Sequence, residues 1–207
     1  MNEVEAAAQL QTIRTLMERA ALYRRALGPT LLTAGVIGCL AALGGELLPG
    51  PGGPAFIGYW LVVALVVITA CVLLMRTQAL RAAEPFWTPP ARRIASAMLP
   101  PLVAGAAMTV FLGRMLDADQ LLAVQLPPIW MVFYGLAVHA AGFFTLRGVR
   151  WLGWAFVLTG AVLGLIFAFY PGLMPLRHDH LLMGATFGLG HLAAGGWLMV
   201  QERKSAA

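Results

Sequence analysis

Residues 53–75 read GPAFIGYWLVVALVVITACVLLM, and this stretch decides the fold class. It holds 23 consecutive residues without a charged side chain. The hydrocarbon core of a bilayer is about 30 Å thick, and about 20 apolar residues cross it as an α-helix. Because the apolar run is continuous rather than alternating, it predicts a transmembrane helix and not a barrel strand.

The whole chain shares this apolar bias. Of its 207 residues, 60% are hydrophobic and 11% are charged, whereas soluble domains carry about 25% charged residues. So few charges cannot cover a water-soluble surface, and in lipid only helices or closed barrels satisfy their backbone groups. We therefore expect an all-α integral membrane bundle of six transmembrane helices. Their predicted ranges are 29–48, 53–75, 94–116, 128–146, 151–170 and 181–200.

The residues before the first span form a segment of a different kind. Between Val4 and Leu27, apolar residues recur at helical spacing opposite arginines and glutamates. This pattern predicts an amphipathic helix over 1–28 on the cytoplasmic membrane surface, and docking to a partner or a second copy is its alternative role. The chain then divides into this helix, a six-helix membrane domain over 29–200 and a cytoplasmic tail over 201–207.

The distribution of positive charge predicts the orientation. Twelve of the 14 Lys and Arg residues fall on one side of the six spans, and two, Arg114 and Arg177, fall on the other. Cytoplasmic segments carry the excess of Lys and Arg, so both termini are expected in the cytoplasm. The net charge of +5 fits segments that face anionic lipid. Nucleic acid is not expected as a partner, because no basic stripe interleaved with aromatic residues occurs.

Two histidines fall inside the fourth and sixth spans, which run in the same direction. His139 and His191 each lie about 10 residues into their span, or about 15–17 Å deep, and therefore near the bilayer midplane. Each has glycines three or four residues away on its own helix face. These glycines are Gly135 and Gly142 around His139, and Gly188 and Gly195 around His191.

Three interpretations fit the histidines and their glycines. In close helix packing, the glycines let backbones approach and each neutral imidazole bonds across to a polar neighbour. A b-type haem would take His139 and His191 as axial ligands and would use the space beside the glycines. A proton or ligand path is the third, because ionisable groups within spans are commonly functional. The candidate hydrogen-bonding partners are Thr109, Tyr134, Thr159 and Thr186.

Two further features stand out at other positions. Pro100 and Pro101 lie inside the third span, where such a pair is expected to kink the helix and free backbone carbonyls. His178, Asp179 and His180 precede the sixth span and offer zinc-type ligands. A solvated helix cap explains the same three residues, because an acidic side chain is favourable at a helix N-terminus.

Small residues four apart predict helix contacts, either within the bundle or between copies. Gly160 with Gly164, and Gly184 with Gly188, are two such pairs. No GxSxG motif, Walker loop, HExxH motif or paired acidic residues within a span occur in the sequence. We therefore expect a protein that is not an enzyme.

Three short segments carry a family resemblance. They are MERAALYR (17–24), EPFWTPP (84–90) and FGLGH (187–191). Together they resemble a family of small bacterial six-span membrane proteins that has no assigned activity. The resemblance implies a bacterial inner-membrane location and brings no ligand or catalytic residue.

These patterns favour a non-enzymatic inner-membrane protein that binds a small ligand or a partner within the bilayer, with transport as one such role. The binding groove would lie between the fourth and sixth spans, near the kinked third. Two alternatives remain open. One is a redox protein that carries b-type haem on His139 and His191. The other is a structural subunit of a larger membrane complex or homo-oligomer.

Overall fold

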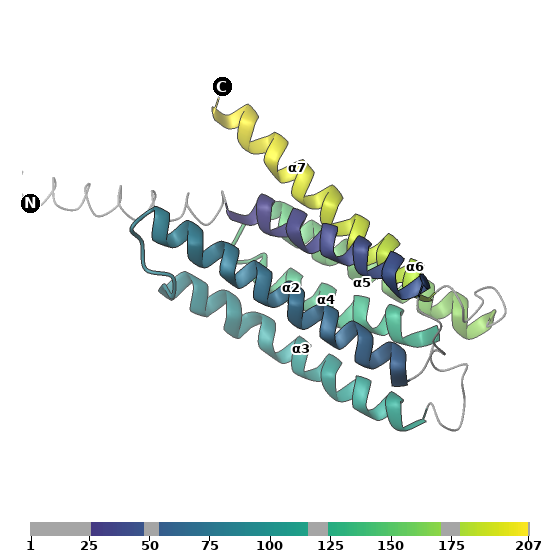
Figure 1. Cartoon of the computed structure of the whole chain (residues 1–207). Coiled ribbons are helices and arrows are strands. Elements are labelled where there is room, and N and C mark those ends of the chain that lie inside the picture. Colours follow the sequence, from purple (N-terminus) through teal and green to yellow (C-terminus); the bar gives the residue numbers. More distant parts are fainter. Residues whose placement is uncertain (1–25, 48–53, 116–123, 171–178, 207) are drawn as a thin grey trace, which may run out of the picture.

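The computed structural model describes residues 26–47, 54–115, 124–170 and 179–206, and every regular element in these ranges is helical (Figure 1). The expected all-α fold class is therefore confirmed for this part of the chain. The elements are the helix Ala26–Leu47, α2 (Pro54–Arg81), α3 (Pro89–Met115), α4 (Leu126–Ala141), α5 (Arg147–Phe169), α6 (Asp179–Met183), the π-helical segment η4 (Gly184–Gly188) and α7 (Leu189–Ala206).

Five of these helices are long and apolar enough to cross a membrane, which makes the chain a multi-pass membrane protein. They are Ala26–Leu47, Ala55–Arg81, Pro89–Met115, Arg147–Phe169 and Asp179–Lys204, the last being continuous through α6, η4 and α7. The helix α4 is also apolar but has only 16 residues. At about 1.5 Å per residue it is roughly 24 Å long, shorter than a hydrocarbon core of about 30 Å.

The structure describes most of the predicted C-terminal tail but almost none of the predicted N-terminal helix. The amphipathic helix predicted over 1–28 lies almost entirely outside the described residues, which begin at Ala26. At the other end, α7 continues to Ala206, so most of the predicted 201–207 tail is an extension of the last helix.

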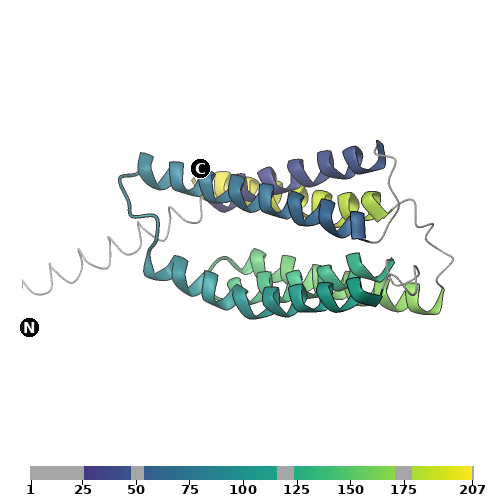
Figure 2. The same ribbon diagram turned by 60° about the horizontal axis from the view of Figure 1, so that its bottom comes forward.

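The helices are arranged in two layers (Figure 2). One layer contains the Ala26–Leu47 helix, α2 and the continuous α6–η4–α7 helix, and the other contains α3, α4 and α5. Neighbouring helices within a layer run side by side over most of their length in both views. We call these the first and the second layer.

Glycines bring helices of the same layer into backbone contact. In the first layer, a Cβ atom added to Gly35 would lie 2.8 Å from the carbonyl oxygen of Gly188. In the second layer, a Cβ atom on Gly153 would lie 2.5 Å from the backbone nitrogen of His139. Real Cβ atoms essentially never approach so closely, so glycine is required at both helix crossings.

The two layers meet through side chains instead. Wherever a described glycine comes this close to the backbone of another helix, the two helices belong to the same layer. The described glycines that face the other layer would meet side-chain atoms only, at Ile57 for Gly113, Trp197 for Gly148 and Phe156 for Gly190. Backbone contact at glycines therefore joins the Ala26–Leu47 helix to η4 and α7 in the first layer and α4 to α5 in the second, and no described glycine makes such a contact between the layers.

The main apolar core joins the layers at the end where α2, α4 and α6 begin. Its buried members are Ala42, Phe56, Trp60, Leu112, Leu126 and Met183. The Phe56 ring of α2 also stacks on the Trp130 ring of α4, with centroids 5.8 Å apart. This end of the bundle is thus closed by large side chains from both layers.

The proline pair lies within an unbroken helix. The helix α3 runs through Pro100 and Pro101 without interruption, and its buried residues are Gly105, Thr109 and Leu112. Because proline lacks a backbone N–H, the carbonyls four residues before the pair lose their helical donors. Pro100 is exposed, so this residue does not line the interior of the bundle.

Candidate functional site

His191 of α7 is buried between the two layers, and both of its ring nitrogens are engaged. Nδ1 lies 2.6 Å from the carbonyl oxygen of Phe187, and Nε2 lies 2.5 Å from the hydroxyl of Tyr134. A carbonyl oxygen can only accept, so Nδ1 carries the hydrogen. In the neutral ring Nε2 is then an acceptor, and the Tyr134 hydroxyl donates to it. This hydrogen bond links α4 of the second layer to α7 of the first.

Aromatic rings surround this pair. The ring centroids of Tyr134 and Phe156 each lie 5.4 Å from that of His191. Phe187 lies 5.4 Å from Tyr134 and 5.1 Å from Phe156 by the same measure. These four residues, which we call the interlayer cluster, come from α4, α5, η4 and α7. Phe156 and Phe187 thus pack against a polar pair, of which His191 is buried.

The π-helical segment that carries Phe187 is fixed by its glycines. A Cβ on Gly184 would lie 2.5 Å from the Cβ of Ala42, and one on Gly188 would lie 2.6 Å from Sγ of Cys39. Both contacts are with the Ala26–Leu47 helix of the same layer. Short π-helical segments inside α-helices are frequent at functional sites. Here the segment ends three residues before His191 and supplies the Phe187 carbonyl oxygen to which Nδ1 of His191 donates.

His139 has a separate environment inside the second layer. It lies in the last turn of α4, and its Nδ1 is 3.5 Å from the carbonyl oxygen of Arg150. Its ring makes edge contacts with Phe143 and Trp154, at centroid distances of 5.2 and 5.4 Å. Each of these contacts comes from α5 or from the turn that precedes it.

The two imidazoles differ in level and in direction, contrary to the expectation of a common depth. Tyr134, which bonds to His191, precedes His139 by five residues, which is about 7.5 Å along α4 and about 140° around it. The helix α4 ends at Ala141, although the sequence pattern predicts a span to residue 146. His139 therefore lies near the end of its helix, whereas His191 lies near the middle of the Asp179–Lys204 span.

The four glycines beside the histidines serve packing within the layers. Cβ atoms on Gly135 and Gly142 would lie 2.7 Å from the oxygen of Gly153 and 2.8 Å from the nitrogen of Arg150, both on α5. Gly188 and Gly195 press on the Ala26–Leu47 helix instead. The two pairs thus have different partners, and close helix packing explains both of them.

This geometry does not suit a haem held by both histidines. Axial ligation needs two imidazole nitrogens that point at one iron from opposite sides of a ring. His139 and His191 point to different partners, and Nε2 of His191 already accepts from Tyr134. The pair is therefore not an axial ligand set in this structure.

His180 forms a second aromatic site, at the start of α2. Trp60 donates through Nε1 to Nδ1 of His180 over 3.1 Å. The centroids of Phe56 and Tyr59 each lie 5.1 Å from the imidazole centroid. The sequence signal for this site is the spacing of the three aromatic residues at positions 56, 59 and 60, which places them on one face of α2.

The zinc-type ligands of this region are only partly described. His178 lies outside the described residues, whereas Asp179 is buried and His180 packs on the α2 aromatic residues. Within the described ranges, no group of three or more His, Cys, Asp or Glu side chains could hold a metal ion. Aromatic packing thus accounts for His180.

The sequence identifies His191 and Tyr134 of the interlayer cluster but not its two phenylalanines. Tyr134 is one of the four candidate partners that the sequence offers for the two histidines, and in the structure it bonds to His191. Phe156 and Phe187 carry no local signal, because they are apolar residues in apolar spans.

Comparison with protein-family models, curated proteins and solved structures finds no match to this chain.

Proposed function

We propose that this chain is a non-enzymatic membrane protein that binds a small ligand between its two layers, at the interlayer cluster of Tyr134, Phe156, Phe187 and His191. One observation carries the proposal. Glycine-mediated backbone contacts join helices only within a layer, whereas side chains alone join the layers. The glycine-joined helices of each layer, Ala26–Leu47 with η4 and α7 and α4 with α5, can therefore move as units, and the surface exposed by such movement is the one around His191.

The two kinds of contact respond differently to strain. Backbone atoms at a glycine crossing have no rotamers with which to adapt, whereas aromatic side chains can reorient. Membrane transporters commonly move one bundle against another around a site near the midplane. The position of His191 near the middle of its span supports a site of this kind, and transport is the form of ligand binding that such movement serves.

The chemistry of the cluster indicates the class of ligand. Separation of the layers breaks the Tyr134–His191 hydrogen bond, which leaves one donor on the hydroxyl and one acceptor on Nε2. Both groups then need new partners, because unpaired polar groups inside a membrane protein are costly. A ligand with an apolar or aromatic body and an adjacent donor and acceptor, such as an amide or carboxylic acid, would satisfy them and pack on Phe156 and Phe187.

The same proposal includes six spans, with α4 as the short one. Eight of the 16 residues of α4 are buried, and α3 and α5 flank it within the second layer. A helix covered by protein needs less apolar length than one surrounded by lipid. Six spans place both termini on one side of the membrane.

The orientation in a bacterial inner membrane rests on charge. Among the described residues, eight of nine Lys and Arg side chains lie at the end of the bundle where α2 ends and α3 begins. The ninth, Arg114, lies at the opposite end. Positive side chains favour the cytoplasmic side, so we assign the eight-cation end, and with it both termini, to the cytoplasm.

Thiol accessibility tests the proposed opening. Gly190→Cys, with Cys39 and Cys71 replaced by alanine, places a thiol between the layers beside Phe156. The control retains only the native Cys39, which packs within the first layer. We expect a small water-soluble methanethiosulfonate reagent to modify Cys at position 190 in lipid nanodiscs, and to leave Cys39 unmodified, as measured by intact mass.

Two results would contradict the proposal. One is the absence of modification at position 190 during a period that suffices to label the denatured protein fully. The other is equal modification of both cysteines, because the reagent would then enter the whole bundle and not only the space between the layers.

A further inference from the structure

The turn between α2 and α3 has a fixed backbone on its α2 side. Ala83 adopts the left-handed conformation, with φ of 53°. Its N–H donates to the oxygen of Leu80 over 3.1 Å, and the N–H of Glu84 donates to the oxygen of Ala79 over 3.0 Å. This pair of hydrogen bonds is the Schellman ending of an α-helix, and it directs the chain sharply away from α2.

The α3 side of the turn is fixed as well. Thr88 is buried, and its hydroxyl oxygen accepts from the N–H of Ala91 over 3.4 Å. Its carbonyl oxygen accepts from the N–H of Arg92 over 3.0 Å. Threonine in this arrangement caps the start of a helix. The turn therefore has a defined backbone, from which its outward side chains project.

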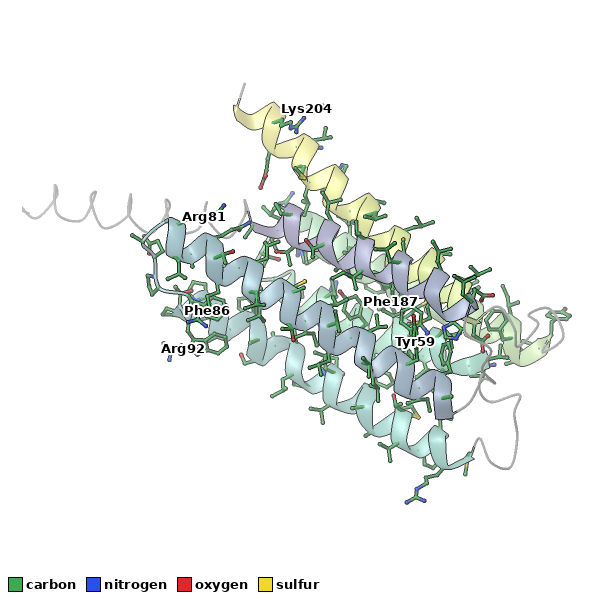
Figure 3. The ribbon with its side chains drawn as sticks, viewed as in Figure 1. Tyr59, Arg81, Phe86, Arg92, Phe187 and Lys204 are labelled. Atoms are coloured by element: carbon green, nitrogen blue, oxygen red, sulfur yellow. The ribbon has the colours of Figure 1, made fainter. Side chains whose placement is uncertain are left out.

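These outward side chains are an exposed tryptophan and three arginines. Trp87 is 58% exposed, and Arg81 at the end of α2 and Arg92 and Arg93 at the start of α3 are exposed as well. Figure 3 shows Arg81 and Arg92 on either side of Phe86, at the end of α2 opposite Tyr59. We call Arg81, Trp87, Arg92 and Arg93 the turn cluster. Tryptophan prefers the interfacial region of a bilayer, which is where phospholipid headgroups lie.

Charge around the turn is strongly unbalanced. Within residues 81–93, Glu84 is the single acidic side chain against three arginines, and the first turn of α3 holds no acidic residue. The same end of the bundle carries eight described cations and two described acids, whereas the opposite end carries one cation and two acids. This end is therefore complementary to an anionic surface.

We propose that the turn cluster binds the headgroup of an anionic phospholipid. Guanidinium groups form paired, charge-assisted hydrogen bonds with phosphate, so Arg81, Arg92 and Arg93 supply the recognition. Pro89 and Pro90 have no backbone N–H, so arginine side chains rather than the start of α3 contact the phosphate. Trp87 occupies the interfacial layer beside the bound lipid. This site is separate from the interlayer cluster and does not depend on it.

Lipid retention tests the site. The protein is purified from nanodiscs that contain equal amounts of phosphatidylglycerol and phosphatidylcholine, and bound lipid is counted by native mass spectrometry. We expect selective retention of phosphatidylglycerol. Arg92→Gln with Arg93→Gln should reduce it about thirtyfold. The matched control is Arg203→Gln with Lys204→Gln, which removes two charges from α7 at the same end and should leave most retention intact.

Fluorescence places the lipid beside the tryptophan. The difference between the intact protein and Trp87→Phe isolates the emission of Trp87, and we expect brominated phosphatidylglycerol to quench it more than brominated phosphatidylcholine. Equal lipid loss in both charge variants would overturn the proposal, as would equal quenching by the two lipids. Displacement of the retained lipid by millimolar inorganic phosphate would overturn it also, by identifying a free anion as the ligand.

Discussion

Replacement of Gly35 by leucine is expected to prevent assembly of the first layer. A Cβ at this position would lie 2.7 Å from the backbone nitrogen of Leu192 and 2.8 Å from the oxygen of Gly188. Because both neighbours are backbone atoms, no change of rotamer relieves the overlap, and the Ala26–Leu47 helix must move away from η4 and α7. We expect a loss of more than about 3 kcal/mol of stability.

The measurement is the midpoint of thermal unfolding in detergent, with gel filtration to count monodisperse protein. Gly58→Leu is the matched control, because a Cβ on Gly58 meets no atom within 4 Å. Leucine also favours the helix over glycine equally at both sites, by about 1 kcal/mol. Equal stability of the two variants would show that the glycine crossing does not hold the layer together.

Loss of the Tyr134 hydroxyl should produce the second large effect. Tyr134→Phe leaves the aromatic ring in place and removes the donor to Nε2 of His191. The ring of His191 cannot compensate by turning over, because its Nδ1 hydrogen is used by Phe187. A buried acceptor without a donor costs about 1–3 kcal/mol, and the thermal midpoint should fall accordingly.

Two comparisons separate this effect from general damage. Tyr170→Phe makes the same chemical change on an exposed residue at the end of α5 and should leave the midpoint unchanged. His191→Leu combined with Tyr134→Phe removes both polar partners, so the double variant should lose less stability than the sum of the single variants. Strict additivity would contradict a direct bond between the two residues.

The spans could be predicted from sequence because a segment that crosses lipid must be apolar, and a long apolar run is visible in the composition. The run over 53–75 is apolar because it crosses the membrane, and the structure extends it to α2, Pro54–Arg81. The end of α4 could not be predicted in this way. Residues 142–146 are GFFTL, and this apolar sequence does not record that helical hydrogen bonding stops at Ala141.

The candidate site was predictable only in part, for a related reason. The helical period identifies His191 as a polar residue in mid-span and Tyr134 as one candidate partner. It does not tell which helices are neighbours, so it cannot pair residues separated by 57 positions or join Trp60 to His180 across 120. The glycines illustrate the same limit, since their spacing predicts contact but the partner helix is known only from the fold.

Distances between spin labels test the two-layer account most directly. In a background without native cysteines, label pairs at exposed sites would join α2 to α7 (Leu61 and Leu189), α3 to α5 (Val110 and Leu158) and α2 to α5 (Leu61 and Leu158). Pulsed electron paramagnetic resonance in lipid nanodiscs should give one narrow distance for each of the first two pairs, which lie within layers. The α2–α5 pair, which joins the layers, should give a broad or double distribution. Three equally narrow single distances would contradict independent layers and the ligand site between them.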